Sequence, residues 1–234
     1  MTAQVQMRRR LPEYRALVLD VDGTLYGGAV LRAAMALELA VFFLTHPWRL
    51  RELRALRYFR TLHNGGVSLE VSNEQACYDF TAQRYHLIEA QLCSLVDTWL
   101  TQRPLKYVRL FRNRPLLKAV ARLQQQGTTI ALYSDYPTAQ KAATLDLDPD
   151  FQFCAADPAI NCFKPDRRGM EHILHMLGLP ATEVLMIGDC DEKDGAIARA
   201  VGMDYLITSK SRQARGILRT AARAGGSDQE APLS

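Results

Sequence analysis

The chain lacks paired cysteines. Its five cysteines are odd in number and scattered along 234 residues, and no two of them have the CxxC spacing of a zinc or redox site. Reduced thiols in a cytosolic protein are the simplest interpretation. The sequence also lacks a Walker phosphate loop and the GxSxG and HExxH motifs, so none of these signatures points to its chemistry.

Long apolar segments are missing as well. The longest apolar run, Ala33 to Leu44, is interrupted by Glu38 and is too short to span a bilayer. Arg8-Arg9-Arg10 precedes the first expected strand without an apolar stretch, so we expect no secretory signal. These absences predict a cytoplasmic protein with no transmembrane segment.

A strong net charge is missing too. The formal charge of +4 is a weak argument for nucleic acid, and we expect no nucleic-acid partner. The charge is unevenly placed, because residues 31–62 contain six arginines and two glutamates, an excess of four that equals the excess of the entire chain. A hydrophobic content of 48% and a charged content of 23% are typical of a soluble globular protein.

The order of apolar patterns predicts an α/β core that is split by an all-helical insertion. Expected strands lie at residues 14–19, 107–111, 129–133, 151–154, 184–187 and 205–207, and expected helices between them at 115–126, 137–145, 167–177 and 194–201. Alternating strands and helices favour a parallel, Rossmann-like sheet. The insertion shows only helical patterns, at residues 31–44, 48–62 and 78–102, with Ser72-Asn73-Glu74 as a further capped start. We assign residues 1–26 and 104–208 to the core, 27–103 to the insertion, and 209–234 to a basic, partly disordered tail.

The core is organised around one stretch, Asp20-Val21-Asp22-Gly23-Thr24-Leu25, which directly follows the first apolar strand. In an extended chain, residues two apart share a face, so the two carboxylates lie together beside a glycine turn. Such an arrangement is costly unless a cation is present. A simple Asp/Gly turn that closes a strand is the alternative, and the rest of the chain decides between them.

Polar residues also follow the other strands. Ser134-Asp135 follows the strand expected at 129–133, Lys164 comes a few residues beyond that at 151–154, and Asp189 follows that at 184–187, with Asp194 five positions on. Ligands of open α/β sheets bind at the carboxyl ends of the strands, so these side chains are expected to converge. The converging carboxylates repel one another, and a hard divalent cation such as Mg²⁺ resolves that repulsion. The Ser134 hydroxyl and the amides around Gly23 are suitable donors to a phosphoryl oxygen.

Together, DVDGT at 20–24, Ser134, Lys164-Pro165 and GDCDEKD at 188–194 resemble, in order and spacing, the four motifs of the haloacid dehalogenase (HAD) superfamily. The resemblance covers about three-fifths of the chain and implies that the insertion is a helical cap of type one. It implies Asp20 as the nucleophile that forms an aspartyl-phosphate, with Asp22 as the acid and base. It further implies that Lys164 and Ser134 hold the phosphoryl group, together with substrate-binding positions at Gly23, Thr24 and Asp135. The implied ligands of Mg²⁺ are Asp20, the backbone carbonyl of Asp22, Asp189 and Asp194.

The second carboxylate of the first motif favours a phosphatase that acts on a small phosphorylated substrate. Dehalogenases, phosphonatases and phosphate-pumping ATPases of the superfamily lack an acid at the position of Asp22. Two alternatives stay open: a phosphomutase that uses the same intermediate, and a phosphate-binding regulatory protein without turnover. The sequence names neither the substrate nor the oligomeric state.

The arginine-rich stretch around Trp48 and Tyr58 allows three interpretations. It is a solvated cap surface, a binding site for an anionic group of the substrate, or a peripheral contact with a membrane surface. The last interpretation keeps a lipid phosphate open as the substrate.

Overall fold

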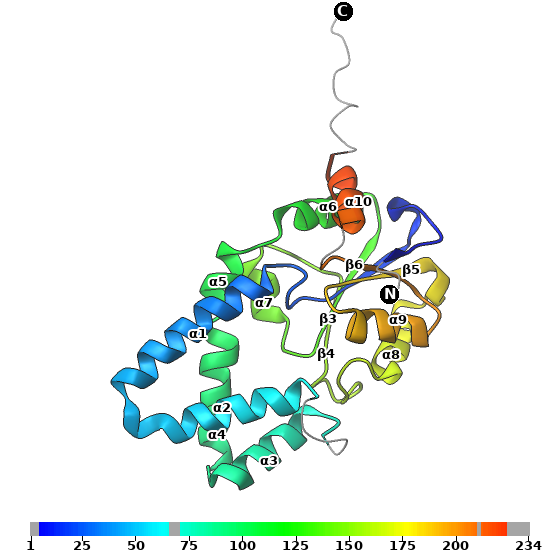
Figure 1. Ribbon diagram of the computed structural model, residues 1–234. Helices are drawn as coiled ribbons and strands as arrows, with labels where there is room; N and C mark the ends of the chain where they lie inside the picture. The colour runs from blue at the N-terminus through cyan, green and yellow to red at the C-terminus, as the bar shows by residue number, and fades with distance from the viewer. Residues whose placement is uncertain (1–4, 66–70, 210–211, 224–234) are drawn as a thin grey trace, which may run out of the picture.

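The protein is an α/β domain with a six-stranded sheet and a group of helices to one side of it (Figure 1). The computed structural model describes residues 5–65, 71–209 and 212–223. The strands are β1 Val5–Gln6, β2 Ala16–Leu19, β3 Thr129–Ser134, β4 Phe151–Cys154, β5 Val184–Gly188 and β6 Asp204–Ile207. Their spatial order is β1-β6-β5-β2-β3-β4, and every pairing is parallel except that of β1 with β6. The predicted Rossmann-like parallel sheet is confirmed.

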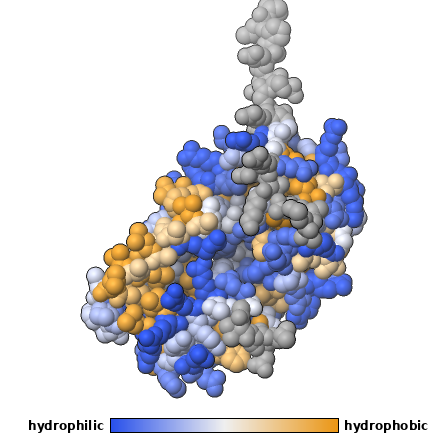
Figure 2. Space-filling view, in the orientation of Figure 1, coloured by the Kyte–Doolittle hydropathy of each residue, from blue (hydrophilic) through white to orange (hydrophobic). Residues whose placement is uncertain are grey.

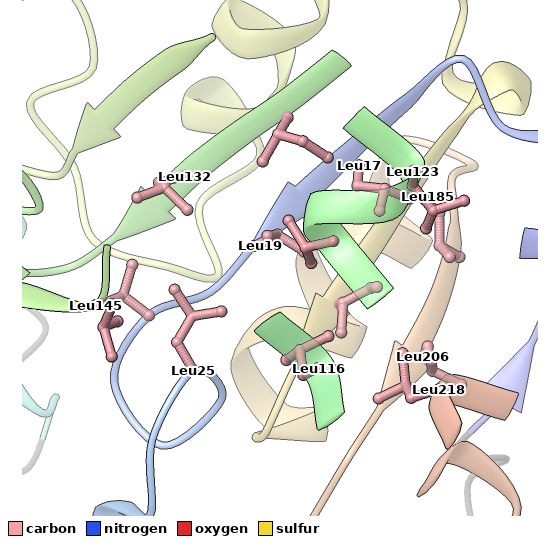
Figure 3. Packing of buried hydrophobic residues seen from close by; sticks show 14 of the residues in the cluster. Leu17, Leu19, Leu25, Leu116, Leu123, Leu132, Leu145, Leu185, Leu206 and Leu218 are labelled. Atoms are coloured by element: carbon pink, nitrogen blue, oxygen red, sulfur yellow. The ribbon is translucent and has the colours of Figure 1, made fainter. Parts of the chain in front are cut away.

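Helices cover both faces of this sheet. These helices are α6 Arg114–Gln125, α7 Ala139–Thr144, α8 Arg167–Leu177, α9 Ala196–Ala200 and α10 Arg212–Arg223. Successive residues of a strand point to opposite faces, so Leu17 and Leu19 pack on one side and Ala16 and Val18 on the other. The first side meets α6, α7 and α10, as the leucines labelled in Figure 3 show. The second side meets α8 and α9. Because both faces are covered, the central strands β2 and β5 contain no polar side chain.

The remaining helices form a second group with a hydrophobic cluster of its own. They are α1 Gly28–Thr45, α2 Leu50–His63, α3 Glu74–Tyr85, α4 Glu89–Val96 and α5 Leu105–Leu110, with a π-helical segment at Asp97–Gln102. Phe43, Phe59, Leu92 and Trp99 are buried within this cluster. In Figure 1, α1 to α4 lie away from the sheet. The chain enters this group directly after the stretch that begins at Asp20.

Two predicted elements, one in the core and one in the insertion, differ in the structure. The strand expected at 107–111 is helix α5, because a short apolar run suits either state and the central strand β2 is already paired on both sides by β3 and β5. The capped start expected at Ser72-Asn73-Glu74 is confirmed, since helix α3 begins at Glu74 and Asn73 caps it through a bond from the amide of Ala76, but the helix expected at 78–102 is not continuous. It is interrupted at His86, whose φ of 47° is left-handed.

A strand and a helix also lie at the N-terminal and C-terminal ends of the core. Strand β1, which the sequence did not reveal because it has only two residues, pairs with the edge strand β6. The basic tail contains helix α10, whose Leu218 packs against the sheet layer. The expected disorder from Gly225 onward lies outside the described residues.

Candidate active site

The carboxyl ends of three neighbouring strands bring together the residues that the sequence singled out. Asp20 directly follows β2, Ser134 ends β3, and Asp189 directly follows β5. The amide of Asp20 donates to the carbonyl of Ile187 at 2.9 Å, so the β2–β5 pairing continues to the first residue of the site. Parallel pairing thus places residues that are more than a hundred positions apart in the sequence at one edge of the sheet.

Asp20 is buried and held at both carboxylate oxygens. Lys164 Nζ donates to its Oδ1 at 2.6 Å, and the Thr24 hydroxyl donates to its Oδ2 at 2.9 Å. The same Lys164 ammonium donates to Asp194 Oδ1 at 2.7 Å, so one lysine joins two buried carboxylates. Because both oxygens accept bonds from buried donors, the orientation of the Asp20 carboxylate is fixed.

The surroundings of Asp20 and Asp189 disfavour the ionised form of their carboxyl groups. Burial raises the pKa of the Asp20 carboxyl above its ordinary value; the attraction of Lys164 opposes this rise, and the neighbouring carboxylates of Asp194 and Asp22 add to it. Burial, followed by the charge of Asp194, raises the pKa of Asp189 to about 6. Burial lowers the pKa of the Lys164 ammonium, but Asp194 and Asp20 outweigh it and raise that pKa well above its usual value. The aspartates of this site therefore need more positive charge than Lys164 supplies.

Three carboxylates form a cluster suited to a divalent cation. One oxygen from each of Asp20, Asp189 and Asp194 lies within 4.8 Å of the others. Oxygen atoms of carboxylates are the ligands that Mg²⁺ prefers, and it needs few of them from the protein. With all three groups ionised, the cluster carries three negative charges against the single positive charge of Lys164, which leaves the charge of one divalent cation to be supplied. The donor set fits the ion that the sequence implied.

The loop after β5 is shaped to hold this cluster. Asp194 lies in a π-helical turn, Asp191–Gly195, and its Oδ2 accepts bonds from the amides of Asp189 and Cys190 at 3.1 and 3.2 Å. Gly23 faces this loop with a φ of +100°, and a Cβ at that position would lie 2.1 Å from Asp189 Oδ2. Glycine is therefore required at position 23 both by its backbone conformation and by the closeness of Asp189.

Asp22 reaches the same cavity and is held by donors from two directions. Ser134 Oγ donates to its Oδ2 at 2.8 Å, and Lys141 Nζ lies 2.7 Å from both of its carboxylate oxygens. The Tyr26 hydroxyl donates to Oδ1. Burial raises the pKa of the Asp22 carboxyl, but the charge and hydrogen bonds of Lys141, with Tyr26 and Ser134, outweigh it and lower the pKa below its ordinary value. Asp22 is a carboxylate in the free protein.

Asp135 belongs to the rim of the site. Its Oδ1 accepts a bond from the amide of Lys164 at 3.0 Å, and its Oδ2 accepts one from Lys193 Nζ at 2.7 Å. Burial raises the pKa of Asp135, but Lys164 and Lys193 outweigh it and lower that pKa. Asp135 thus ties the Lys164 loop to the Asp194 turn.

A cavity of about 320 Å³ connects these groups to the helical group above the sheet. Its floor contains the aspartates, Ser134 and Lys164, whereas its opposite wall is largely apolar. The apolar part of the lining consists of Leu31, Met35, Leu39, Trp99 and Leu100, and the polar side chains of Arg32, Arg60 and Asn64 also line the cavity. Gly23 lines the cavity, but Thr24 is fully buried and its hydroxyl faces Asp20.

Sequence reasoning missed three residues of the site: Lys141, Tyr26 and Lys193. Lys141 lies on α7, seven positions after Ser134, and is 3% exposed. A lysine on a short helix carries no recognisable signal, because only the packing of α7 beside β2 turns it toward Asp22. Lys193 stands inside the recognised GDCDEKD motif and Tyr26 two residues after DVDGT, but their contacts depend on how the loops fold.

Comparison with known proteins decides the family. The family model described as haloacid dehalogenase-like hydrolase matches residues 14–202. The chain belongs to the haloacid dehalogenase-like hydrolases. This match covers β2 to α9 and includes the whole site at the strand ends. No curated protein matches the chain significantly.

Solved structures of the HAD-like hydrolases share the fold of this chain at low sequence identity. A 2-haloacid dehalogenase from Pseudomonas syringae is 16% identical, with a TM-score of 0.56, over 83% of this chain and 86% of that one. A HAD phosphatase from Thermococcus onnurineus is 17% identical, with a TM-score of 0.51, over 91% and 98% of the two chains. YfnB from Bacillus subtilis, a provisionally assigned HAD-hydrolase bound to magnesium, is 18% identical, with a TM-score of 0.52, over 84% and 88%. Dehalogenases and phosphatases both occur among these structures, so the likeness shows the fold alone, and the site must indicate the reaction.

Proposed function

We propose that this HAD-like hydrolase is a Mg²⁺-dependent phosphatase that hydrolyses a phosphate monoester through an aspartyl-phosphate on Asp20. The observation that carries the proposal is the pair of carboxylates with opposite surroundings. Asp20 belongs to a cluster of three carboxylates whose negative charge exceeds the positive charge of Lys164 by two. Asp22, two residues later, is separately paired with Lys141. A dehalogenase attacks carbon and needs neither a cation nor a second acid at that position.

Each residue has a distinct role in the proposed reaction. The Asp20 carboxylate, oriented by Lys164 and Thr24, attacks phosphorus. Asp22, ionised in the free protein, first takes up the proton of the monoanionic phosphate ester and then delivers it to the departing ester oxygen. Water then attacks the aspartyl-phosphate, and Asp22 accepts its proton and regenerates Asp20. Lys164 and the Ser134 hydroxyl stabilise charge on the transferring phosphoryl oxygens. Mg²⁺ bound by Asp20, Asp189, Asp194 and the carbonyl of Asp22 would supply the positive charge that keeps Asp20 ionised.

The cavity further indicates what the phosphate is attached to. Its polar floor takes the phosphoryl group, and the helical group contributes aliphatic side chains and Trp99 together with the polar Arg60 and Asn64. A hydroxyl placed against the leucines, Met35 or Trp99 would have no partner, which is unfavourable, whereas Arg60 and Asn64 offer donors to a single polar or anionic group. We therefore propose that the substrate carries an apolar group next to its phosphate.

The experiment that tests the reaction is release of inorganic phosphate from an aryl phosphate, with Mg²⁺ and with a chelator. We expect release by the wild type only with Mg²⁺, and a fall of at least about a thousandfold in Asp20→Asn, because the nucleophile is lost. Asp148→Asn makes the same chemical change at an exposed loop position and keeps wild-type activity.

Other outcomes contradict the proposal. Equal release by wild type and Asp20→Asn would show that Asp20 is not the nucleophile. Halide release from a 2-haloacid without Mg²⁺, with no phosphate release, would make the protein a dehalogenase. Faster turnover of sugar phosphates than of aryl or alkyl phosphates would contradict the apolar substrate group.

A further inference from the structure

Helix α1 presents an exposed apolar face to solvent. Four large hydrophobic residues share this face at helical spacing, and we call them the α1 outer face: Val30, Leu37, Val41 and Leu44, which are 53%, 68%, 55% and 80% exposed. Small alanines, Ala33 and Ala40, are exposed between them. Figure 2 shows hydrophobic atoms gathered over α1, the blue helix at the left of Figure 1. Apolar patches of this kind on monomers mark interaction surfaces.

The opposite face of α1 is already occupied within the protein. Met35 and Phe43 are buried in the helical group, while Leu31 and Leu39 line the active-site cavity. Among the described helices, α1 is the one that is long and apolar enough to cross a membrane by length and composition, with 11% of its residues buried. Crossing would separate its inner face from the cavity and break the ion pairs of Glu38 with Arg103 and Lys106. The helix is therefore suited to lie along a surface.

A basic margin continues from the end of this face. Trp48, 74% exposed, follows α1 on the short 3₁₀ turn Pro47–Arg49, which runs straight into α2. Three exposed arginines then recur at intervals of three, and we call them the arginine row: Arg51, Arg54 and Arg57. Residues three apart are neighbours on a helix, each turned by about 60° from the last, so the strip formed by Trp48 and the arginine row winds around roughly 120° of the α2 surface.

Within α1 and α2 no unpaired acidic residue offsets this charge. The two acidic residues of the stretch from α1 to α2, Glu38 and Glu52, are each paired with an arginine of the same helical group. The strip that runs from the α1 outer face through Trp48 to the arginine row is thus apolar at one end and cationic at the other. This is the composition of helices that bind in the interface of anionic membranes.

We propose that the α1 outer face and the arginine row dock the protein on an anionic lipid surface. The apolar side chains enter the boundary between headgroups and acyl chains, Trp48 lies at headgroup level, and the arginines contact lipid phosphates or carboxylates. In this orientation the helix that forms one wall of the catalytic cavity rests on the lipid surface. The docking itself does not depend on the reaction proposed above.

Charge favours a lipid surface over a second copy of the chain. Two copies that met through the α1 outer face in a symmetric dimer would bring their arginine rows toward each other. Like charges repel, and neither copy offers an exposed acidic residue between Gly28 and His63 to relieve that repulsion. An anionic bilayer complements both the apolar and the cationic parts of the strip.

Vesicle sedimentation tests the docking directly. Full-length protein is mixed with phosphatidylcholine vesicles with or without phosphatidylserine, at low and at high salt. We expect binding to the phosphatidylserine vesicles at low salt that weakens as salt rises. Leu37→Glu should lower the affinity at least about tenfold by placing a charge in the apolar face. Arg54→Gln should lower it roughly fivefold.

The matched control is Met176→Glu, which introduces the same charge at a residue that is 48% exposed on α8. It should bind vesicles like the wild type, and circular dichroism should show that all variants are folded. Absence of wild-type binding to anionic vesicles at low salt overturns the proposal, and so does equal binding by wild type and Leu37→Glu. A wild-type dimer in analytical ultracentrifugation that Leu37→Glu dissociates would assign the face to a second copy and also overturn it. Because vesicle binding needs no turnover, its result is independent of whether the protein is a phosphatase.

Discussion

Replacing Lys141 with methionine removes the ammonium group that keeps Asp22 ionised. Lys141 Nζ lies 2.7 Å from each carboxylate oxygen of Asp22 and is almost completely buried. Methionine fills much of the volume of the lysine stem without its charge. Tyr26 and Ser134 still donate to Asp22 in the variant, but they are neutral. We therefore expect the pKa of Asp22 to rise in Lys141→Met.

The size of the effect follows from the distance between the two charges. Unit charges 2.7 Å apart attract by about 1.5 kcal/mol at the dielectric constant of water and by about 6 kcal/mol at an effective value of 20. The Asp22 side chain is 34% exposed, so solvent screening makes the lower figure appropriate. An energy of about 1.4 kcal/mol changes an equilibrium tenfold. At a given pH, the ratio of protonated to ionised Asp22 should thus rise at least about tenfold.

Carbon NMR of the aspartate carboxyl groups measures this ratio directly. The signal of Asp22 is assigned by its loss in Asp22→Asn, and its titration is followed in wild type and in Lys141→Met. The Asp22 signal should begin to titrate at a clearly higher pH in Lys141→Met. In kinetics, turnover of an aryl phosphate, whose leaving group needs no proton, should fall off at a higher pH on the acid side, because the base form of Asp22 is depleted sooner.

Two variants separate this effect from a general disturbance of the site. Lys141→Arg keeps a positive charge and should keep Asp22 ionised. Lys193→Met removes a lysine from the same rim, but that lysine is paired with Asp135, so the titration of Asp22 should not change. The reasoning is refuted if a folded Lys141→Met shows the wild-type titration of Asp22.

Two further predictions concern the turn after β2 and the boundary of the helical group. Gly23→Ala should weaken Mg²⁺ binding in calorimetry, because the added Cβ meets the Asp189 carboxylate. The control Gly127→Ala has a similar φ of +91° and open space around the added Cβ, so it should lower only the stability of the fold. Equal Mg²⁺ affinity in both variants would contradict this prediction. Burial lowers the pKa of His63 to about 4 from 6.5, so between these pH values the unfolded chain binds a proton that the folded chain excludes, and stability rises with pH. His63→Phe should remove roughly 3 kcal/mol of that pH dependence in denaturant titrations, and an unchanged slope would show that His63 is not the group responsible.

The motifs could be read from the sequence because each needs only a few adjacent residues. A strand that ends in Asp20 and Asp22 before a glycine with positive φ is local chemistry, and the alternation of strands and helices predicts that strand ends share one edge. From that rule alone, Ser134, Lys164 and Asp189 were expected to lie close together. The helix α5 was not predictable in the same way, because its short apolar run fits a strand equally well.

The surroundings of each carboxylate required the folded structure. Asp20 and Asp22 are the same residue type two positions apart, yet one shares Lys164 with Asp194 and the other is paired with Lys141. These partners lie more than a hundred positions away, and their distances depend on how α7 and the loops pack. The difference in pKa between the two aspartates is therefore a property of the tertiary structure.

By itself, the sequence determined the sheet, the family and the residues at the strand ends, because periodicity and short motifs act over neighbouring positions. Only the tertiary structure decided which face of α1 lines the cavity and which face meets solvent. The sequence of α1 is apolar nearly all round, so its periodicity does not single out an inner face. Packing against Phe59 and Trp99 selects that face, and it leaves Leu37 and Leu44 exposed.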